Sequence, residues 1–277
     1  MNSQTRRPIG IFDSGVGGLT VLKAIRSRLP GENLVYLGDT ARLPYGTKSP
    51  ASIARYAEQA TAHLLGADIK LLVVACNTAS AVALESLRAA LTPLPVIGVV
   101  EPGSEAAVAA RPGGAHLVLA TETTVRLGAY RAALSRLDPG ADVRELPCEL
   151  LVALAEEGWT SGAEAEAVVR RYLAAAEQSA YRPDSIILGC THFPLLRDVI
   201  AKCAPAGTSV VDSAKTTAEV VAAELGAGGA KTGSGTLKLY ATDGATRFAR
   251  VGGRFLGEPL RATDIELVDL EPGGAVR

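Results

Sequence analysis

Short apolar segments alternate with longer amphipathic segments along most of the chain. Leu71–Val74 and Ser185–Leu188 are nearly continuous aliphatic runs, which is typical of parallel strands buried on both faces. The segments between such runs are rich in alanine and carry apolar residues at spacings of three and four, which predicts helices. The predicted strands are Pro8–Phe12, Leu34–Leu37, Leu71–Val74, Val96–Val99, Ala115–Leu119, Val143–Leu146, Ser185–Leu188, Ser209–Val211 and Leu237–Ala241, and the clearest predicted helices are Ser52–Leu65, Ala81–Leu91, Ala163–Ala176 and Thr216–Leu225.

Strands that alternate with helices in this way are typical of the α/β class with mainly parallel sheets. At 277 residues the chain is near the size at which one hydrophobic core divides into two. The glycine-rich segment Gly226–Gly235 is interpreted as a surface loop or linker. A phosphate-binding loop is disfavoured there, because no strand precedes the segment and no Gly-Lys-Ser/Thr sequence occurs in it.

One strand-and-turn unit occurs twice in the sequence. Leu71–Thr78 and Ser185–His192 both consist of an apolar strand, a small residue, a cysteine and polar residues, and predicted helices follow at Ala81–Leu91 and Leu195–Lys202. The repeat predicts two similar lobes, each a mainly parallel sheet flanked by helices. Each cysteine is expected at the carboxyl end of a strand, where open α/β sheets bind their ligands.

The strand order along the chain suggests how the two lobes divide it. We expect residues 1–98 and 211–277 to form the first lobe and residues 99–210 the second. The later strands near residues 209 and 237 must return to a sheet, which is why the chain's last part is assigned to the first lobe.

The cysteines differ in their sequence surroundings. Cys148 and Cys203 lie in or beside apolar segments and are interpreted as small buried hydrophobic residues. Cys76 and Cys190 are each followed by polar residues and a predicted helix. Backbone N–H groups and the helix dipole at such a position are expected to lower the thiol pKa toward neutrality. A thiolate placed there can act as a base or a nucleophile.

The turn around Asp13 and the three histidines supply further candidates. The glycines that follow Asp13 allow backbone amides to approach a carboxylate, and the dinucleotide fingerprint fails because Thr20 stands at its third glycine position. Asp13 itself could hold an ammonium group, orient a base or cap a helix. His192 shares a turn with Cys190 and could exchange protons with it. His63 and His116 are interpreted as polar groups satisfied by local hydrogen bonds.

Charge and composition narrow the function classes. The formal net charge is −1, 48% of residues are hydrophobic and 21% are charged, as in an ordinary soluble globular protein. This balance argues against nucleic acid or an anionic membrane as partner. No apolar run approaches the roughly 18 residues of a membrane span, and the first residues do not resemble a signal peptide, so a cytoplasmic location is expected. The four cysteines lack any Cys-x-x-Cys spacing, which disfavours disulfides and a zinc ribbon.

Four motifs, in this order, resemble the glutamate racemases, cofactor-independent enzymes of the aspartate/glutamate racemase superfamily. They are Ile11–Thr20, Tyr36–Gly46, Ala75–Thr78 and Gly189–Pro194, and together they span about the first two hundred residues. The resemblance implies interconversion of L- and D-glutamate without a cofactor or a metal, at an active site in the cleft between the two lobes. It also implies a homodimer and, in a walled bacterium, supply of D-glutamate for peptidoglycan.

The resemblance assigns roles to particular residues. Cys76 would deprotonate D-glutamate and Cys190 would deprotonate L-glutamate, each returning a proton to the opposite face. Asp13 and His192 would assist Cys76 and Cys190 respectively, and Glu156 matches an acidic residue near the second cysteine. The residues that would bind substrate are Asp13, Ser14, Pro44, Tyr45, Gly46, Asn77, Thr78, Thr124, Thr191 and His192.

Two positions depart from the family pattern, and three other functions stay open. Leu127 stands where a serine is common, and Ala153 replaces a frequent proline. The chain also starts without the extension that carries an activator site in some relatives, so no such activation is expected.

The alternatives are racemisation of another amino acid, above all aspartate; a binding or regulatory role, since some relatives restrain DNA gyrase; and a zinc site made of Cys76, Cys190, His192 and Asp13.

Overall fold

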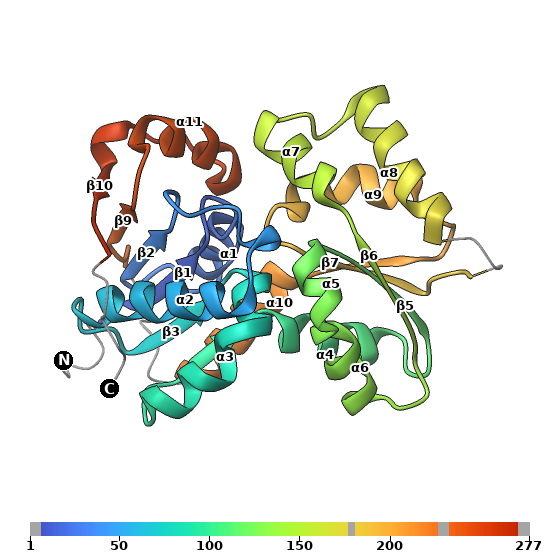
Figure 1. The fold of residues 1–277 in the computed structure, drawn as a ribbon, viewed down its shortest axis with the longest axis horizontal. Coiled ribbons are helices and arrows are strands. Elements are labelled where there is room, and N and C mark those ends of the chain that lie inside the picture. Colours follow the sequence, from blue (N-terminus) through green and yellow to red (C-terminus); the bar gives the residue numbers. More distant parts are fainter. Residues whose placement is uncertain (1–6, 177–180, 227–232, 271–277) are drawn as a thin grey trace.

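The computed structural model describes residues 7–176, 181–226 and 233–270, and these form two parallel sheets flanked by helices (Figure 1). The predicted α/β class and the two-lobed architecture are confirmed. The first sheet has six strands in the order β10-β9-β2-β1-β3-β4. Its strands are β1 (Ile9–Asp13), β2 (Leu34–Gly38), β3 (Leu71–Val74), β4 (Val96–Gly98), β9 (Leu237–Ala241) and β10 (Ile265–Leu267).

The second sheet has four strands in the order β6-β5-β7-β8, and its pairings are also parallel. Its strands are β5 (Ala115–Ala120), β6 (Asp142–Pro147), β7 (Ser185–Gly189) and β8 (Ser209–Asp212). The first sheet therefore draws its strands from the two ends of the chain, and the second from the middle. The lobe boundaries near residues 98 and 210 stay a prediction.

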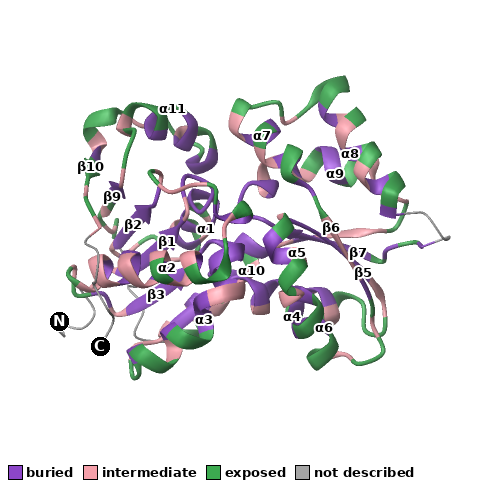
Figure 2. Ribbon diagram, in the orientation of Figure 1, coloured by how far each residue is buried: buried purple, intermediate pink, exposed green. Residues whose placement is uncertain are grey.

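The helices lie on both faces of each sheet, and the central strands β1, β2, β3 and β7 are buried along their whole length (Figure 2). Each predicted helix overlaps an observed one, although α3 begins four residues earlier than expected, directly after Cys76. The helix predicted after Cys190 begins as a 3₁₀ turn, Phe193–Leu196. The helices are α1 (Leu19–Arg28), α2 (Pro50–Leu65), α3 (Asn77–Leu91), α4 (Val100–Ala110), α5 (Glu122–Leu127), α6 (Ala129–Leu137), α7 (Glu149–Glu157), α8 (Gly162–Ala176), α9 (Arg197–Cys203), α10 (Ser213–Leu225) and α11 (Ala245–Leu256).

Two helices connect the lobes. Helix α10 follows the last strand of the second sheet and packs against both α1 and α4. Helix α11 belongs to the first lobe, where its apolar residues Phe248, Val251 and Phe255 are buried. In Figure 1 its end lies close to α7 of the second lobe. The lobes are thus joined by packed helices as well as by the chain itself.

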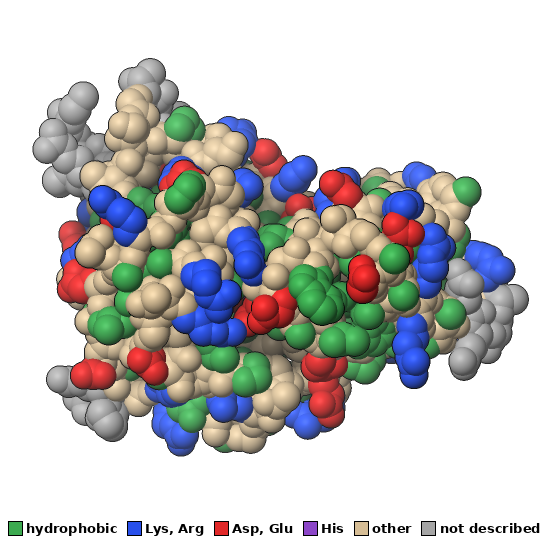
Figure 3. Space-filling view, turned by 90° about the horizontal axis from the view of Figure 1, so that it is seen from above, with side chains coloured by type: hydrophobic (Ala, Val, Ile, Leu, Met, Phe, Trp, Pro, Cys, Tyr) green, Lys and Arg blue, Asp and Glu red, His purple; other side chains and the backbone are tan. Residues whose placement is uncertain are grey.

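The surface carries acidic and basic side chains mixed together on the face shown in Figure 3. Within the described residues, no helix is long and apolar enough to cross a membrane. The loop predicted at Gly226–Gly235 falls mainly on residues 227–232, which lie outside the described part of the chain.

Candidate active site

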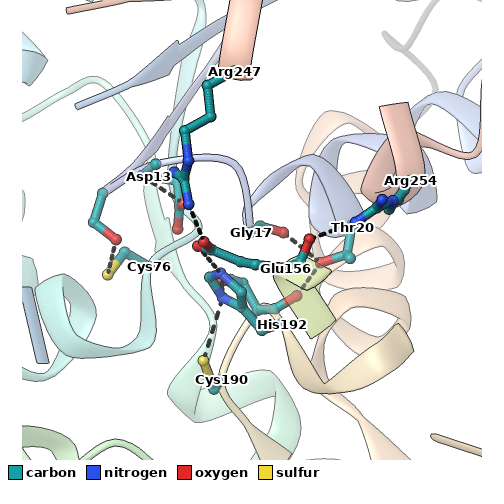
Figure 4. Close-up of polar contacts among 12 residues, drawn as sticks. Asp13, Gly17, Thr20, Cys76, Glu156, Cys190, His192, Arg247 and Arg254 are labelled. Carbon is teal, nitrogen blue, oxygen red and sulfur yellow. Dashed lines mark hydrogen bonds and ion pairs between the residues drawn. The ribbon is translucent and has the colours of Figure 1, made fainter. Parts of the chain in front are cut away.

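The carboxyl ends of strands from both sheets converge on one group of buried side chains. Asp13 is the last residue of β1, Cys76 follows β3 by two residues, and Cys190 directly follows β7. Cys76 is 5% exposed and Cys190 is 6% exposed. The predicted positions of the two cysteines, at the ends of parallel strands, are confirmed. Figure 4 shows Asp13, Cys76, Cys190 and His192 in this region.

Cys76 caps helix α3 and contacts the turn that follows β1. Its Sγ accepts a hydrogen bond from the N–H of Ala79 at 3.5 Å and donates one to Ser14 Oγ at 3.6 Å. Burial, followed by the charge of Asp13, raises the pKa of the Cys76 thiol to about 12, although the hydrogen bonds with Ala79 and Ser14 oppose the shift. The expectation of a lowered pKa at this helix terminus was wrong, because desolvation outweighs the helix amides.

Cys190 has an imidazole partner instead of a hydroxyl. His192 Nδ1 lies 3.6 Å from Cys190 Sγ, and His192 Nε2 lies 3.2 Å from Glu156 Oε1. Burial lowers the pKa of His192, but its hydrogen bonds with Cys190 and Glu156 and the charges of Cys190 and Asp13 prevail and raise it to about 10. His192 is therefore an imidazolium near neutral pH, with both ring nitrogens as donors.

Glu156 connects His192 to the opposite lobe. Its Oε2 accepts a hydrogen bond from Arg247 Nη2 at 2.7 Å, and its backbone carbonyl accepts one from Arg254 Nη1 at 2.6 Å. The hydrogen bond from His192, followed by the charges of His192 and Arg247, lowers the pKa of Glu156 to about 2 against the effect of burial. The carboxylate is thus ionised at neutral pH. The resemblance predicted that Glu156 lies near the second cysteine. In the structure, His192 contacts both Glu156 and Cys190 and so links the two residues.

Asp13 is buried at the end of β1 and does not cap helix α1. Its Oδ2 accepts a hydrogen bond from the N–H of Gly15 at 2.9 Å, whereas the residue capping α1 is Gly18. Burial raises the pKa of the Asp13 carboxyl, although the charge of His192 and backbone amides lower it. Within the described residues, Asp13 Oδ1 is buried without a hydrogen-bond partner. Such an oxygen is suited to an ammonium group.

Three threonine hydroxyls form a cluster where the lobes meet. Thr78 Oγ1 lies 3.0 Å from Thr121 Oγ1 and 3.3 Å from Thr124 Oγ1, and Thr121 Oγ1 lies 3.1 Å from Thr124 Oγ1. The sequence reasoning identified Thr78 and Thr124 but missed Thr121. A usable signal existed, because Thr121 follows the carboxyl end of β5, the edge that binds ligands in such sheets.

Asn77 adds an amide beside this cluster. Its Oδ1 accepts a hydrogen bond from the hydroxyl of Tyr130 at 2.7 Å. Its Nδ2 is buried and has no partner among the described residues. An unpaired N–H donor beside three hydroxyls forms a setting suited to a carboxylate. Tyr130, which orients the amide, was not among the residues the sequence indicated as a site residue.

The Pro44-Tyr45-Gly46 segment reaches the site through its backbone. The Tyr45 hydroxyl donates a hydrogen bond to Asp39 Oδ2 at 2.5 Å. The carbonyl of Gly46 accepts a hydrogen bond from Thr123 Oγ1 at 2.6 Å. A Cβ on Gly46 would lie 3.0 Å from Cβ of Thr121. Gly46 therefore allows this loop of the first lobe to approach the second lobe closely.

A second close approach holds His192 against the first lobe. The hydroxyl of Thr20 donates to the backbone carbonyl of Thr191 at 2.9 Å. A Cβ on Gly17 would lie 2.3 Å from Thr191 Oγ1 and 2.5 Å from His192 Nδ1. Figure 4 shows Gly17 and Thr20 beside His192. Because Gly17 has no side chain, the turn from Cys190 to His192 can pack directly against it.

The remaining cysteine and histidine candidates have other partners. Cys148 is buried and its Sγ donates to the carbonyl of Leu146 at 3.4 Å, as expected for a structural cysteine. His116 Nδ1 lies 2.7 Å from Ser185 Oγ, and His63 packs edge-on against Tyr240. Among the described residues, no group of three or more His, Cys, Asp and Glu side chains is arranged to hold a metal ion.

Comparisons with known proteins identify the family of this chain. The family described as Asp/Glu/hydantoin racemase matches residues 17–221. A glutamate racemase of Geobacter metallireducens is 47% identical over 268 residues, which cover 96% of this chain and 97% of that protein.

Two solved structures have the same fold over nearly the full chain. The glutamate racemase of Francisella tularensis in complex with D-glutamate is 34% identical, covers 96% of this chain and 99% of its own, and has a TM-score of 0.87. The glutamate racemase of Thermus thermophilus in complex with β-chloro-D-alanine is 40% identical, covers 97% of this chain and 99% of its own, and has a TM-score of 0.85. This chain therefore belongs to the Asp/Glu/hydantoin racemase family, among the glutamate racemases, and is an amino-acid racemase, an isomerase.

Proposed function

We propose that this enzyme interconverts L- and D-glutamate by proton transfer between Cα and two thiols, Cys76 and Cys190. The observation that carries the proposal is the placement of one buried cysteine from each lobe at converging strand ends, each with its own polar partner. Cys76 lies beside Ser14 and Asp13, and Cys190 beside His192. The named activity of the relatives supports glutamate as the substrate.

The two thiols exchange roles with the direction of reaction. One thiolate removes the α-proton, which leaves the bonding electron pair on Cα, and the opposite thiol donates its proton to the other face of that carbon. The first cysteine then holds the proton and the second is a thiolate. The proposed mechanism uses no cofactor to delocalise the electron pair on Cα. Preorganised dipoles and exclusion of water must therefore stabilise the carbanion.

The polar groups around the thiols suit the charged ends of an amino acid. The unpaired oxygen of Asp13 would hold the substrate ammonium group, and that cation offsets the charge that helps to keep the pKa of Cys76 high. The Asn77 amide and the hydroxyls of Thr78 and Thr121 would hold a carboxylate. Substrate binding thereby favours the thiolate that the reaction needs.

The test is racemisation of L-glutamate in D₂O by purified protein without added pyridoxal phosphate or metal. With the wild-type protein, we expect the optical rotation to disappear while deuterium enters at Cα. With Cys76→Ala and with Cys190→Ala, we expect neither racemisation nor deuterium uptake. Cys203→Ala, which removes a thiol whose polar neighbours are Glu166, Arg170 and Lys202, should stay active. Turnover of aspartate instead of glutamate would change the substrate and keep the mechanism. Absence of exchange with either amino acid, in folded and reduced protein, would refute the mechanism.

The wider setting is also a proposal. We expect the enzyme to supply D-glutamate for peptidoglycan and to form a homodimer, as the resemblance implies, and to act in the cytoplasm. Growth of a bacterium that requires D-glutamate, restored by the wild-type gene and not by a Cys76→Ala gene, would test the first expectation. Sedimentation of the purified protein would test the dimer.

A further inference from the structure

Helix α11 of the first lobe contacts the His192 side of the site at three points. Arg247 binds the carboxylate of Glu156, Arg254 binds the backbone carbonyl of the same residue, and the ring of Phe255 packs edge-on against His192 at 5.0 Å between centroids. Arg247 and Arg254 are seven residues apart, or two helical turns, so both guanidinium groups lie on one side of α11. Figure 4 shows both arginines extending toward Glu156.

The end of α7 is shaped to receive this helix. Glu156 is one of the last residues of α7, and its carbonyl is one of the acceptors that a helix terminus leaves unpaired. Gly158, which ends the helix with a φ of 79°, would bring a Cβ to 3.1 Å from the Arg254 guanidinium. A side chain at this position would therefore crowd Arg254 as well as strain the turn.

The Glu156 carboxylate is divided between the two lobes. Oε1 faces His192 of its own lobe, and Oε2 faces Arg247 of the other lobe. A carboxylate held at one oxygen alone can rotate about its terminal bonds, whereas one held at both oxygens has a fixed plane. Any separation of α11 from α7 would break the hydrogen bond between Arg247 and Oε2. The carboxylate could then rotate, and Oε1 would no longer be held toward His192.

We propose that Arg247 is a positioning residue of the racemase reaction: from the first lobe it fixes Glu156, and through Glu156 it holds His192 toward Cys190. Docking of the lobes and assembly of the Cys190 proton-transfer group are then one event. The catalytic consequence rests on the proposed function, whereas the positioning itself does not.

The experiment compares Arg247→Met with Arg247→Lys and with Arg250→Met. Arg250 lies on the same helix, is exposed, and makes no ion pair with the described residues, so its replacement controls for loss of one positive charge. We expect racemase kcat/KM to fall about tenfold or more in Arg247→Met, as a share of what a positioned acid–base group contributes. Arg247→Lys should recover part of the loss, and Arg250→Met should stay within about twofold of wild type.

A second readout separates positioning from simple electrostatics. The chain has only three histidines, so ring-labelled His192 can be followed by NMR during a pH titration and assigned with His192→Asn. The titratable groups facing His192 are Cys190 on its own turn, Asp13 from β1 and Glu156 from α7. If Arg247 only contributes a nearby positive charge, its removal raises the His192 pKa or leaves it unchanged. If it positions Glu156, the pKa falls.

The outcomes are distinguishable from failure of the proposed function. A lowered pKa of His192 in Arg247→Met, unchanged in Arg250→Met, supports the positioning role even if the wild-type protein does not racemise glutamate. An unchanged or raised pKa, or a kcat/KM equal to that of Arg250→Met in an active enzyme, would overturn it. His63 and His116 serve as internal standards, because neither contacts Glu156.

Discussion

At the scale of single residues, the two candidate bases have different surroundings. Cys76 has a hydroxyl and a carboxyl group nearby, and burial keeps its pKa high. Cys190 lies beside the His192 imidazolium, whose other ring nitrogen is hydrogen-bonded to Glu156. A reaction that is symmetric in its two substrates is thus served by a site that is chemically asymmetric, and isotope effects can detect the asymmetry.

Glu156→Gln should change the primary deuterium isotope effects in opposite directions. The substitution weakens the support of His192 and so raises the barrier for proton transfer at Cys190 more than at Cys76. With α-deuterated substrate, the isotope effect on kcat/KM should rise for the enantiomer that Cys190 deprotonates, which we expect to be L-glutamate, and fall for the other. kcat/KM itself must fall equally in both directions, because the equilibrium is unchanged.

The control for this prediction is Glu157→Gln, which alters the exposed neighbouring carboxylate. It should leave both isotope effects unchanged. Equal changes for the two enantiomers in Glu156→Gln would mean that Glu156 does not act on Cys190 in particular.

The raised pKa of His192 predicts a pH-dependent contribution to stability. The folded protein holds this proton up to about pH 10, whereas an unfolded histidine loses it near 6.5. The stabilisation is therefore fully present below about 6.5 and is lost as the pH rises from there toward 10. In urea unfolding, the advantage of wild type over His192→Asn should shrink across that range. For His116, whose pKa is lowered by burial, replacement by Asn should show no such trend above pH 6.5.

Sequence patterns located the chemistry of these residues better than their state of protonation. Cys76, Cys190 and Asp13 were found because a cysteine or a carboxylate lies within two residues of the end of an apolar strand. The pKa of Cys76 was predicted in the wrong direction, because desolvation depends on neighbours that the local sequence does not contain. Arg247 carried no signal at all, since its partner Glu156 is 91 residues away along the chain.

At the scale of elements, Cys76 has a structural task beside its proposed catalytic one. Its sulfur takes the place of a helix-capping oxygen by accepting the N–H of Ala79. Serine caps helices well and alanine does not. Cys76→Ser should therefore be more stable toward unfolding than Cys76→Ala by about 1 kcal/mol, while both lose racemase activity.

Chemical denaturation of the two variants measures this difference. Replacement of Cys148 by the same two residues is the matched control, since the Cys148 sulfur donates to a carbonyl and receives no helix amide within the described residues. Equal stability of the two Cys76 variants would mean that the sulfur contributes nothing as a cap.

Elements with strong apolar patterns were predictable, and those with weak patterns were not. The strands β1, β3 and β7 are buried along their whole length, and their positions follow from the sequence alone. Strand β10 was missed, because it has three residues and only Ile265 is buried. Its place at the sheet edge depends on its pairing with β9 rather than on its own composition.

At the scale of the whole molecule, Gly17 is expected to set how closely the lobes dock. Gly17→Ala would place a methyl group within 2.3 Å of Thr191 Oγ1, so that the turn carrying His192 must move away. We expect loss of most racemase activity with little change in helix content. Circular dichroism and racemase assays measure these two properties.

Gly140→Ala is the control, because its new methyl group would meet its nearest neighbour at an ordinary 3.5 Å. It should keep full activity. An active Gly17→Ala enzyme would show that the two lobes tolerate a wider separation at this turn.

The arrangement of the lobes was predictable only in part. The repeated strand–cysteine unit correctly indicated two sheets, but helix α10 packs on α1 and α4 from both lobes, and nothing in its sequence indicates that position. Contacts between lobes depend on single glycines and long side chains, whose partners are distant in sequence. They are the least visible part of the fold before the structure is known.

Because β2 pairs with β9, the first sheet cannot be completed until late in synthesis of the chain. A ribosome delivers every cysteine of this chain, and β2 itself, well before residues 237–241 emerge. Until then β2, whose five residues are all buried in the finished sheet, remains an open edge with unpaired backbone groups. A nascent chain therefore holds the complete thiol pair but a sheet that is prone to aggregate, and a product truncated before Leu237 should be insoluble rather than merely inactive.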